Sequence, residues 1–280
     1  MASLSFLQAV ILGLVQGLAE FLPISSSGHL ALLQHFFHIE GDSVLIFAVM
    51  LHLGTLISVF IVYWKDVARL IYELCCCIRD ICKGRGPRIN ANPTRRLGFM
   101  IVVATIPTAL MGFFLNDIFG TMYSSIIVIG ISLVITGTIL FIAERVGSDR
   151  KTVTEMSFLN ALFIGIMQGV AITPGISRSG STLFGGLISG LNREFAVKFA
   201  FLISIPSILG SVILELPEAV HAGVPAGTAG PMIVGIIVAA VSGLVAIKTM
   251  IRIVSKKKLS YFSYYTWIIG AAVIIYAIAS

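Results

Sequence analysis

The sequence predicts an all-α polytopic membrane protein with an inverted-topology repeat, in which each half has one re-entrant helical hairpin and three transmembrane helices. Of the 280 residues, 57% are hydrophobic and only 11% are charged, whereas soluble domains carry about a quarter charged residues. Six apolar segments have the roughly 20 residues that a helix needs to cross a bilayer. Two further apolar segments are interrupted by Pro, Gly and Ser and resemble each other.

The predicted spans are 44–64, 97–115, 121–143, 195–216, 231–251 and 261–279. The two interrupted segments, about 5–36 and 158–191, consist of pieces too short to cross alone, because a helix of about 14 residues covers only about 21 Å. Irregular backbone at membrane depth is tolerated only where protein or a water-filled cavity surrounds it. Each interrupted segment is therefore predicted to be a re-entrant hairpin.

An internal repeat relates the two hairpins. Residues 13–30, GLVQGLAEFLPISSSGHL, align without a gap on 165–182, GIMQGVAITPGISRSGST, so that Gln16 lies over Gln168, 152 residues later. This alignment predicts two halves, 1–143 and 158–280, joined by a cytoplasmic linker at 144–157. Because three spans is an odd number, the second half enters from the opposite face. The identical positions are Gly13, Gln16, Gly17, Ala19, Ile24, Ser25, Ser27 and Gly28, with Gly165, Gln168, Gly169, Ala171, Ile176, Ser177, Ser179 and Gly180 as their counterparts.

The positions of the basic residues agree with this topology. Lys and Arg collect in cytoplasmic loops, and the predicted inner segments contain 18 of the 19 Lys and Arg residues. The net charge of +6 therefore reflects topology and does not indicate a nucleic-acid partner. Of the inner segments, 65–96 is expected to form an amphipathic surface helix followed by a turn. The cysteines in this segment are expected to be reduced, and their spacing is not that of metal ligands. The inner segments are 65–96, 144–157, 192–198 and 248–260.

Two charged residues lie inside the hairpin segments, where topology does not explain them. Glu20 is the only acidic residue in either hairpin, and Arg178 is the one basic residue outside the inner segments. Ionisable groups at membrane depth are costly and usually mark a functional site. An inverted repeat brings its two hairpin tips together, so Glu20 and Arg178 are predicted to meet. The alternative is a purely structural salt bridge, which would not need the surrounding hydroxyls and glycines.

The two loops have different chemistry. The second, TPGISRSGST, has the glycines, hydroxyls and helix start that cradle an oxyanion, and Arg178 adds a planar fork of donors that fits phosphate. The first, LPISSSGH, places serine hydroxyls beside His29 and Glu20, a setting that activates nucleophiles. Together the loops predict phosphoryl transfer or hydrolysis near the membrane.

The motifs QGLAEFLPISSSGH and PGISRSGST resemble the paired signature of the bacterial undecaprenyl-diphosphatase family, the bacitracin-resistance type. The resemblance covers nearly the whole chain. It implies a membrane phosphatase that hydrolyses undecaprenyl diphosphate to undecaprenyl phosphate and inorganic phosphate, recycling the lipid carrier of cell-wall synthesis. It also implies a bacterial inner-membrane location, an active site that faces the outer side, and dependence on a divalent cation, Mg²⁺ or Ca²⁺.

The resemblance assigns roles residue by residue. Glu20 holds the metal or orients His29 or a water, and these alternatives stay open. The nucleophile is Ser26 or His29, or His29 is a base for an attacking hydroxyl from water; Ser26 attack with His29 as proton shuttle is favoured. Gln16, as an amide, weakens any scheme with two carboxylates on one metal. The expected catalytic residues are Glu20, Ser26, His29 and Arg178, and the expected substrate-binding residues are Gln16, Ser25, Ser27, Gly28, Ser177, Ser179 and Thr182.

Other interpretations remain beside the phosphatase. His52 is expected to be a hydrogen-bonded packing residue, and Gln168, the counterpart of Gln16, is a weaker candidate for lining the cavity. A lipid-carrier flippase or transporter would use the same inverted repeat but needs only the anion clamp. A serine hydrolase acting on acyl bonds lacks the G-x-S-x-G motif. The expected partners are the prenyl diphosphate and membrane lipid, with no nucleic acid, and a homo-oligomer is left open.

Overall fold

The structure, a computed structural model, describes residues 4–37, 42–146, 150–222 and 227–279, with the side chains of 42–45, 216 and 218–222 left out. Within these ranges the chain is helical apart from its connections and one isolated bridge between Lys151 and Leu191. The first half contains α1 (Phe6–Phe21), α2 (Ser26–Phe36), α3 (Asp42–Cys82), α4 (Pro93–Phe114), α5 (Asn116–Tyr123) and α6 (Ile126–Arg145). The second half contains α7 (Phe158–Val170), α8 (Arg178–Ile188), α9 (Arg193–Ala222), α10 (Ala229–Ser255) and α11 (Ser260–Ala279).

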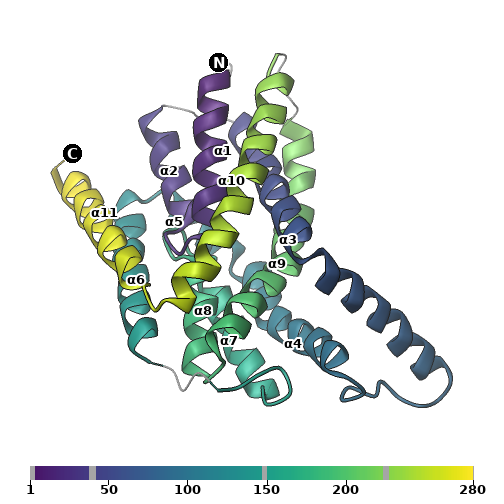
Figure 1. Cartoon of the computed structure of the whole chain (residues 1–280). Coiled ribbons are helices and arrows are strands. Elements are labelled where there is room, and N and C mark those ends of the chain that lie inside the picture. The colour runs from purple at the N-terminus through teal and green to yellow at the C-terminus, as the bar shows by residue number, and fades with distance from the viewer. Residues whose placement is uncertain (1–3, 38–41, 147–149, 223–226, 280) are drawn as a thin grey trace.

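The predicted fold class is confirmed: the described chain is an all-α polytopic membrane protein. Among the described residues, six helices are long and apolar enough to cross a membrane, namely α3, α4, α6, α9, α10 and α11. The apolar helices α1 and α7 are too short to cross, and each forms a hairpin with the helix that follows it. In Figure 1 the α1–α2 hairpin lies in the upper part of the bundle and the α7–α8 hairpin in the lower part. The inverted relation of the halves stays a prediction.

Two differences from the predicted spans concern the first half of the chain. The span predicted to end at 64 continues as helix to Cys82, with one non-helical residue at Tyr63 (φ −106°, ψ 22°). No glycine or proline interrupts residues 55–82, so nothing stops the helix there. The segment 116–120, predicted to be a loop, belongs to the short helix α5, and the next span begins at Ile126 instead of 121.

The internal repeat extends to the starts of the hairpin helices. Ser5 and Gln8 form a capping box at the start of α1, and Ser157 and Asn160 form one at the start of α7, at the same offset of 152 residues. Such reciprocal bonds satisfy two backbone N–H groups that a helix start otherwise leaves free. The sequence therefore fixes the first residue of both hairpins in the same way.

Paired glycines bring each hairpin against one long helix. Gly13 and Gly17 of α1 face α10, where a Cβ on Gly13 would lie 2.6 Å from the carbonyl oxygen of Gly235. Their counterparts Gly165 and Gly169 face α4, where a Cβ would collide with the Ala104 carbonyl and the Met111 side chain. Small residues four apart allow helices in membranes to approach this closely.

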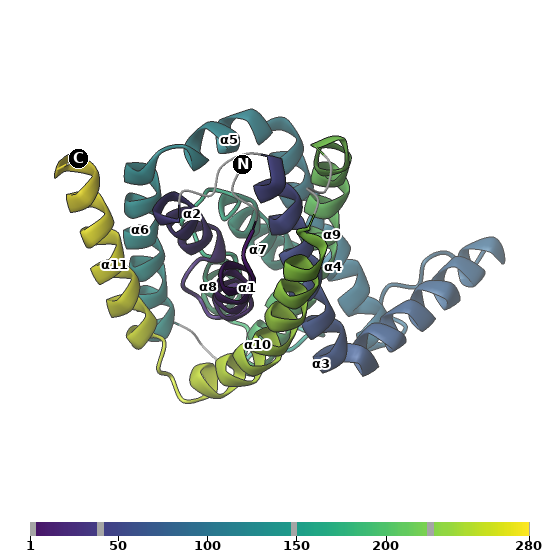
Figure 2. The ribbon, with the colours of Figure 1, turned by 90° about the horizontal axis from the view of Figure 1, so that it is seen from above.

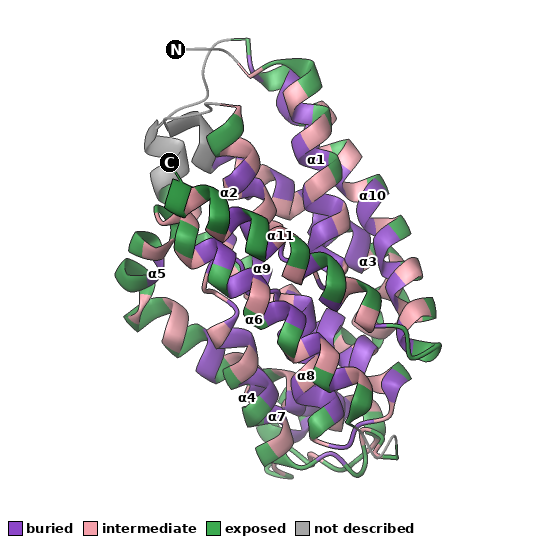
Figure 3. Ribbon diagram, turned by 90° about the vertical axis from the view of Figure 1, so that its left-hand side faces the viewer, coloured by how far each residue is buried: buried purple, intermediate pink, exposed green. Residues whose placement is uncertain are grey.

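The four basic segments meet at one end of the bundle, as the predicted topology requires. Arg96 donates to the carbonyl oxygens of Val153 (3.0 Å) and Met156 (2.7 Å). The Glu144 carboxylate accepts from the backbone N–H (2.6 Å) and hydroxyl (2.8 Å) of Ser260. Viewed from above, the two hairpins lie inside a ring of helices, with α11 outside against α6 (Figure 2). The outer side of α11 is exposed (Figure 3).

Candidate active site

Each hairpin loop ends in a serine that caps the following helix. Ser25 accepts a hydrogen bond from the Gly28 N–H (3.2 Å) at the start of α2, and Ser177 accepts one from the Gly180 N–H (3.1 Å) at the start of α8. Ser26 and Arg178 are therefore the first residues of α2 and α8, at equivalent positions of the repeat. The positive end of a helix dipole at both positions favours a bound anion.

The two tips touch, as the sequence predicts. The Gly175 N–H donates to the Ser27 hydroxyl (3.4 Å), and the Ser179 hydroxyl donates to the Leu22 carbonyl oxygen (3.3 Å). Gly175 has a φ of 89°, and a Cβ there would lie 2.6 Å from the Ile129 carbonyl oxygen. Both the backbone conformation and the close approach require glycine at this position.

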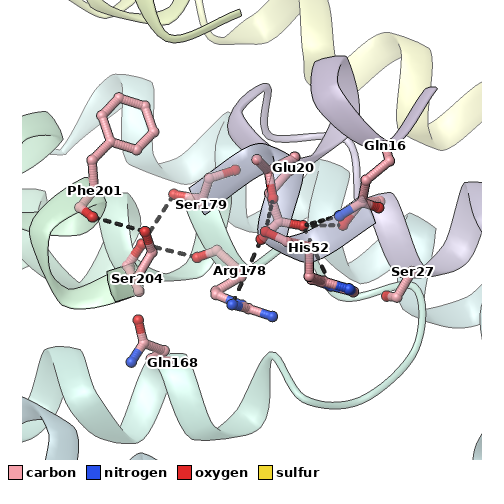
Figure 4. A network of polar contacts seen from close by, with 12 residues as sticks. Gln16, Glu20, Ser27, His52, Gln168, Arg178, Ser179, Phe201 and Ser204 are labelled. Carbon is pink, nitrogen blue, oxygen red and sulfur yellow. Dashed lines mark hydrogen bonds and ion pairs between the residues drawn. The ribbon is translucent and has the colours of Figure 1, made fainter. Parts of the chain in front are cut away.

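Glu20 is the centre of the contact between the hairpins (Figure 4). Its Oε2 accepts hydrogen bonds from the Ser26 hydroxyl (2.6 Å) and from Nε2 of Gln16 (3.1 Å). Its Oε1 lies 3.6 Å from NH1 of Arg178, and only 3% of the Glu20 side chain is exposed. A buried carboxylate needs such partners, because removing an ion from water is costly. The predicted meeting of Glu20 and Arg178 is confirmed.

Two buried atoms at this contact have no hydrogen-bond partner among the described residues. They are NH1 of Arg178, a donor, and Oε1 of Gln16, an acceptor. Buried polar atoms are rarely left unsatisfied in native proteins, so both atoms are available to a ligand. A small pocket next to Arg178 is lined by Glu20, Phe21, Arg178, Ser179, Thr182, Ala200, Phe201 and Ser204.

His52 of α3 also faces this contact (Figure 4). Its Nδ1 lies 2.9 Å from the Ala48 carbonyl oxygen, which can only accept, so Nδ1 carries a proton. Its Nε2 lies 4.0 Å from Oε2 of Glu20, and 22% of the side chain is exposed. The sequence interpretation of His52 as a hydrogen-bonded packing residue agrees with the Ala48 contact but did not predict that Nε2 faces Glu20. The available signal was that His52 is the one residue among His, Asp, Glu, Lys and Arg in the predicted span 44–64.

Comparison with known proteins agrees with this arrangement. Residues 9–272 match the family described as bacitracin resistance protein BacA. The chain belongs to this family. It is 47% identical over 271 residues to the undecaprenyl-diphosphatase of Alkaliphilus metalliredigens, covering 97% of this chain and 98% of the relative. It is 44% identical over 272 residues to the undecaprenyl-diphosphatase of Carboxydothermus hydrogenoformans, covering 96% of each chain.

In this bacitracin-resistance family protein, His29 does not contact Ser26 in the way a proton shuttle requires. Its Nδ1 lies 2.8 Å from the Ser25 carbonyl oxygen and its Nε2 lies 2.8 Å from the Tyr265 hydroxyl. The rings of His29 and Tyr265 also stack, with centroids 5.7 Å apart. Both ring nitrogens are therefore engaged away from Glu20. Tyr265 of α11 was not predicted, because nothing in its local sequence distinguishes it from the neighbouring interfacial aromatic residues.

The predicted hydroxyls of the second loop bond within the protein. Ser177 caps α8, and the Thr182 hydroxyl donates to the Arg178 carbonyl oxygen (2.9 Å). Thr136 of α6, which the sequence did not single out, accepts from the Ser177 N–H and donates to the Gly175 carbonyl oxygen, each at 3.0 Å. These contacts shape the loop that presents Arg178. Their roles in substrate binding, and the catalytic roles of the other predicted residues, stay predictions.

The two repeat-related glutamines lie in different surroundings. Gln16 donates to Glu20, whereas Nε2 of Gln168 donates to the Thr108 hydroxyl of α4 (3.1 Å). Gln168 is almost fully buried. Its bond to α4 is a helix-packing contact, so the same residue has different partners in the two halves.

Proposed function

We propose that this protein hydrolyses undecaprenyl diphosphate to undecaprenyl phosphate and inorganic phosphate, recycling the lipid carrier and thereby conferring bacitracin resistance. The assignment of this substrate is supported by family membership and by relatives that carry the name undecaprenyl-diphosphatase. The observation that carries the chemistry is the contact of Ser26, Glu20 and Arg178 at the junction of two hairpins. It brings a hydroxyl, a carboxylate and a guanidinium together where the two hairpins meet.

In the proposed first step, Arg178 and the start of α8 bind the diphosphate oxygens. Ser26 Oγ attacks the terminal phosphorus and gives its proton to Oε2 of Glu20, which already accepts its hydrogen bond at 2.6 Å. The new Oγ–P bond forms as the bond from phosphorus to the bridging oxygen breaks. The electron pair stays on that oxygen, and undecaprenyl phosphate leaves.

In the second step, water attacks the phosphoserine. Glu20, now protonated, returns its proton to Ser26 Oγ as the Oγ–P bond breaks. The oxygen of the water becomes part of inorganic phosphate, which also takes the protons of the water. Arg178 compensates the charge on the phosphoryl oxygens in both steps, the kind of preorganised stabilisation that dominates such reactions. His29 holds the first loop through Ser25 and Tyr265, and Nε2 of His52 lies 4.0 Å from Oε2 of Glu20.

The cation implied by the family fits the oxygen atoms that remain at the site. The described residues contain no group of three or more His, Cys, Asp or Glu side chains that would hold a metal unaided. Glu20 and the unpaired Oε1 of Gln16 are hard oxygen donors, and Mg²⁺ is commonly held by one carboxylate together with substrate phosphates and waters. Oε1 of Gln16 and Oε1 of Glu20 would hold the cation, which supplies charge neutralisation to the diphosphate, while Oε2 of Glu20 accepts the Ser26 proton.

The proposal places the protein in the bacterial inner membrane with the site open to the outer side. Its support is the gathering of basic loops at the opposite end of the bundle. A cysteine in place of Ser27 should react with a membrane-impermeant thiol reagent added from outside, in a background whose native cysteines are replaced by serine. Labelling only from the cytoplasmic side would contradict this orientation.

The decisive test of the activity is phosphate release from a prenyl diphosphate by the purified protein in detergent. Release should depend on Ser26, Glu20 and Arg178 and should stop when EDTA removes divalent cations. A protein that moves the lipid across vesicles without releasing phosphate would instead be the flippase.

A further inference from the structure

The C-terminal part of α3 and the turn after it form an arm, residues 64–92, that leaves the bundle. Beyond the non-helical backbone at Tyr63, α3 continues without interruption to Cys82. Figure 1 shows the arm leaving the bundle sideways, with its tip level with the lower ends of the other helices. Figure 2 shows it extending well beyond the ring of helices when viewed from above. The arm therefore extends beside the bundle, at the end where the basic loops gather.

The inner side of the arm is polar and held by ion pairs and hydrogen bonds. Arg95, at the start of α4, is only 6% exposed; it donates to Glu73 (3.0 Å) and Asp80 (2.8 Å). The Cys77 thiol donates to the Pro87 carbonyl oxygen (3.4 Å), which closes the turn against the helix. A forked arginine between two carboxylates is a rigid arrangement.

The outer side of the arm is apolar. The residues that form this apolar stripe recur at helical spacing on one side of α3, and Trp64, Leu74 and Ile71 are 61%, 60% and 57% exposed. A soluble protein buries such residues and exposes its ion pairs, whereas this arm does the reverse. An apolar patch of this kind marks an interaction surface. The apolar stripe consists of Trp64, Ile71, Leu74, Cys75, Ile78, Ile81 and Cys82.

A basic flank runs beside the apolar stripe. Lys65, Arg69 and Arg79 are exposed along one side of α3, and Lys83, also exposed, follows directly after the end of this helix. The carboxylates of this segment lie elsewhere: Glu73 and Asp80 bind Arg95 on the inner side, and Asp66 pairs with Lys198 of α9 (2.6 Å). The outward-facing charge of the arm is therefore positive.

We propose that the arm is an interfacial anchor: its apolar stripe lies in the headgroup and acyl boundary of the leaflet at the basic end, and its basic flank binds anionic lipid headgroups. A helix with an apolar face that contains Trp and Leu, beside a face rich in Lys and Arg, has the pattern of helices that lie in the membrane interface. Its sideways direction brings it to lipid beside the bundle. Anionic headgroups match the positive flank, whereas a second copy of the arm would repel it.

The arm carries its own probes, because Cys75 and Cys82 lie on the stripe while Cys76 and Cys77 are buried. In the full chain with Cys82→Ser, Cys75 is labelled with bimane and the protein is reconstituted in vesicles that contain brominated phosphatidylcholine. The matched control carries Cys75→Ser, Cys82→Ser and Lys83→Cys, which moves the label to the basic flank. We expect bromine to quench the Cys75 label at least about threefold more strongly than the control label.

A second comparison tests the charge. Phosphatidylglycerol in the vesicles should strengthen quenching of the Cys75 label, and replacing all four basic-flank residues by Gln should remove this difference. Equal quenching with and without phosphatidylglycerol would overturn the role of anionic lipid.

A Cys75 label reached by aqueous iodide as readily as the control label would place the arm in water. A label shielded from both quenchers, with shielding lost on dilution of the protein in the bilayer, would assign the stripe to a second copy; either result overturns the proposal. Phosphate release by each variant verifies that it is folded.

Discussion

The Ser26 hydroxyl donates a hydrogen bond of 2.6 Å to Oε2 of Glu20, which joins the first residue of α2 to the last turn of α1. The equivalent residue of the second hairpin is Arg178, whose NH1 lies 3.6 Å from Oε1 of the same carboxylate. The repeat therefore brings two equivalent positions to one carboxylate, one as a hydroxyl and the other as a cation. The contributions of Ser26 and Arg178 to turnover can therefore be tested by separate mutations.

Replacing Ser26 by Ala should abolish turnover. If Ser26 Oγ is the attacking atom, phosphate release falls by at least about 10³-fold, while binding of a prenyl diphosphate, measured by its thermal stabilisation of the protein, persists. Ser27→Ala is the matched control, because the Ser27 hydroxyl has hydrogen bonds to Ser25 and Gly175, and it should lose about tenfold or less. Near-normal release by Ser26→Ala would assign the attack to His29 or water.

Replacing Arg178 by Lys should leave a folded but nearly inactive protein. Lysine keeps the charge near Glu20 but has no planar fork and a different reach. Loss of a preorganised oxyanion contact costs about 10²–10³-fold in turnover, so phosphate release should fall by this factor while detergent stability is retained. Adding Glu20→Gln should not restore activity. A lysine variant within a few-fold of the parent would show that Arg178 is only a structural bridge.

His52 should tolerate an amide but not a truncation. Because Nδ1 is engaged with Ala48, Nε2 is the atom that faces Glu20. A glutamine amide can place a polar group near that position, so His52→Gln should keep phosphate release within about tenfold, whereas His52→Ala should lose about 10²-fold. Comparable losses in both variants would indicate that the imidazole itself is required, and no loss in either would return His52 to a packing role.

Adding one methyl group at Gly17 should destabilise the packing of α1 on α10. A Cβ there would collide with the Ser242 hydroxyl and the Ala239 carbonyl oxygen, and the backbone oxygen cannot move freely. Gly17→Ala should lower the free energy of unfolding by about 1–3 kcal/mol, seen as a lower melting temperature in detergent. Gly120→Ala is the control, since nothing lies within 4 Å of its added Cβ. Equal melting temperatures for both variants would contradict the close crossing.

Much of the architecture could be predicted because it depends on patterns that lie along the chain. Apolar length identifies the six spans, and the Pro, Gly and Ser interruptions identify both hairpins. The end of α3 could not be predicted, because the apolar span and the arm beyond it form one helix and no helix-breaking residue separates them. Helix α5 was missed because its eight residues carry no side-chain cap of the kind that marks a helix start.

The site was predictable as a set of residues but not as a set of contacts. The repeat brings Glu20, Ser26 and Arg178 together because the hairpin tips must meet. The direction of each side chain is set by more distant packing: Tyr265, 236 residues after His29, holds that imidazole away from Ser26. His52 reaches the site from a different helix, and its distance to Glu20 depends on how α3 packs beside α1.

The pairing of Glu20 with Arg178 also has a consequence for biosynthesis. Arg178 is made 158 residues after Glu20, a delay of about 8–30 s at common synthesis rates of about 5–20 residues per second. During that interval the acidic hairpin exists without its cation, and the partners available to Glu20 are those of its own half: Gln16, Ser26 and His52. These three residues give the nascent first half a way to accommodate a carboxylate before the second half is complete.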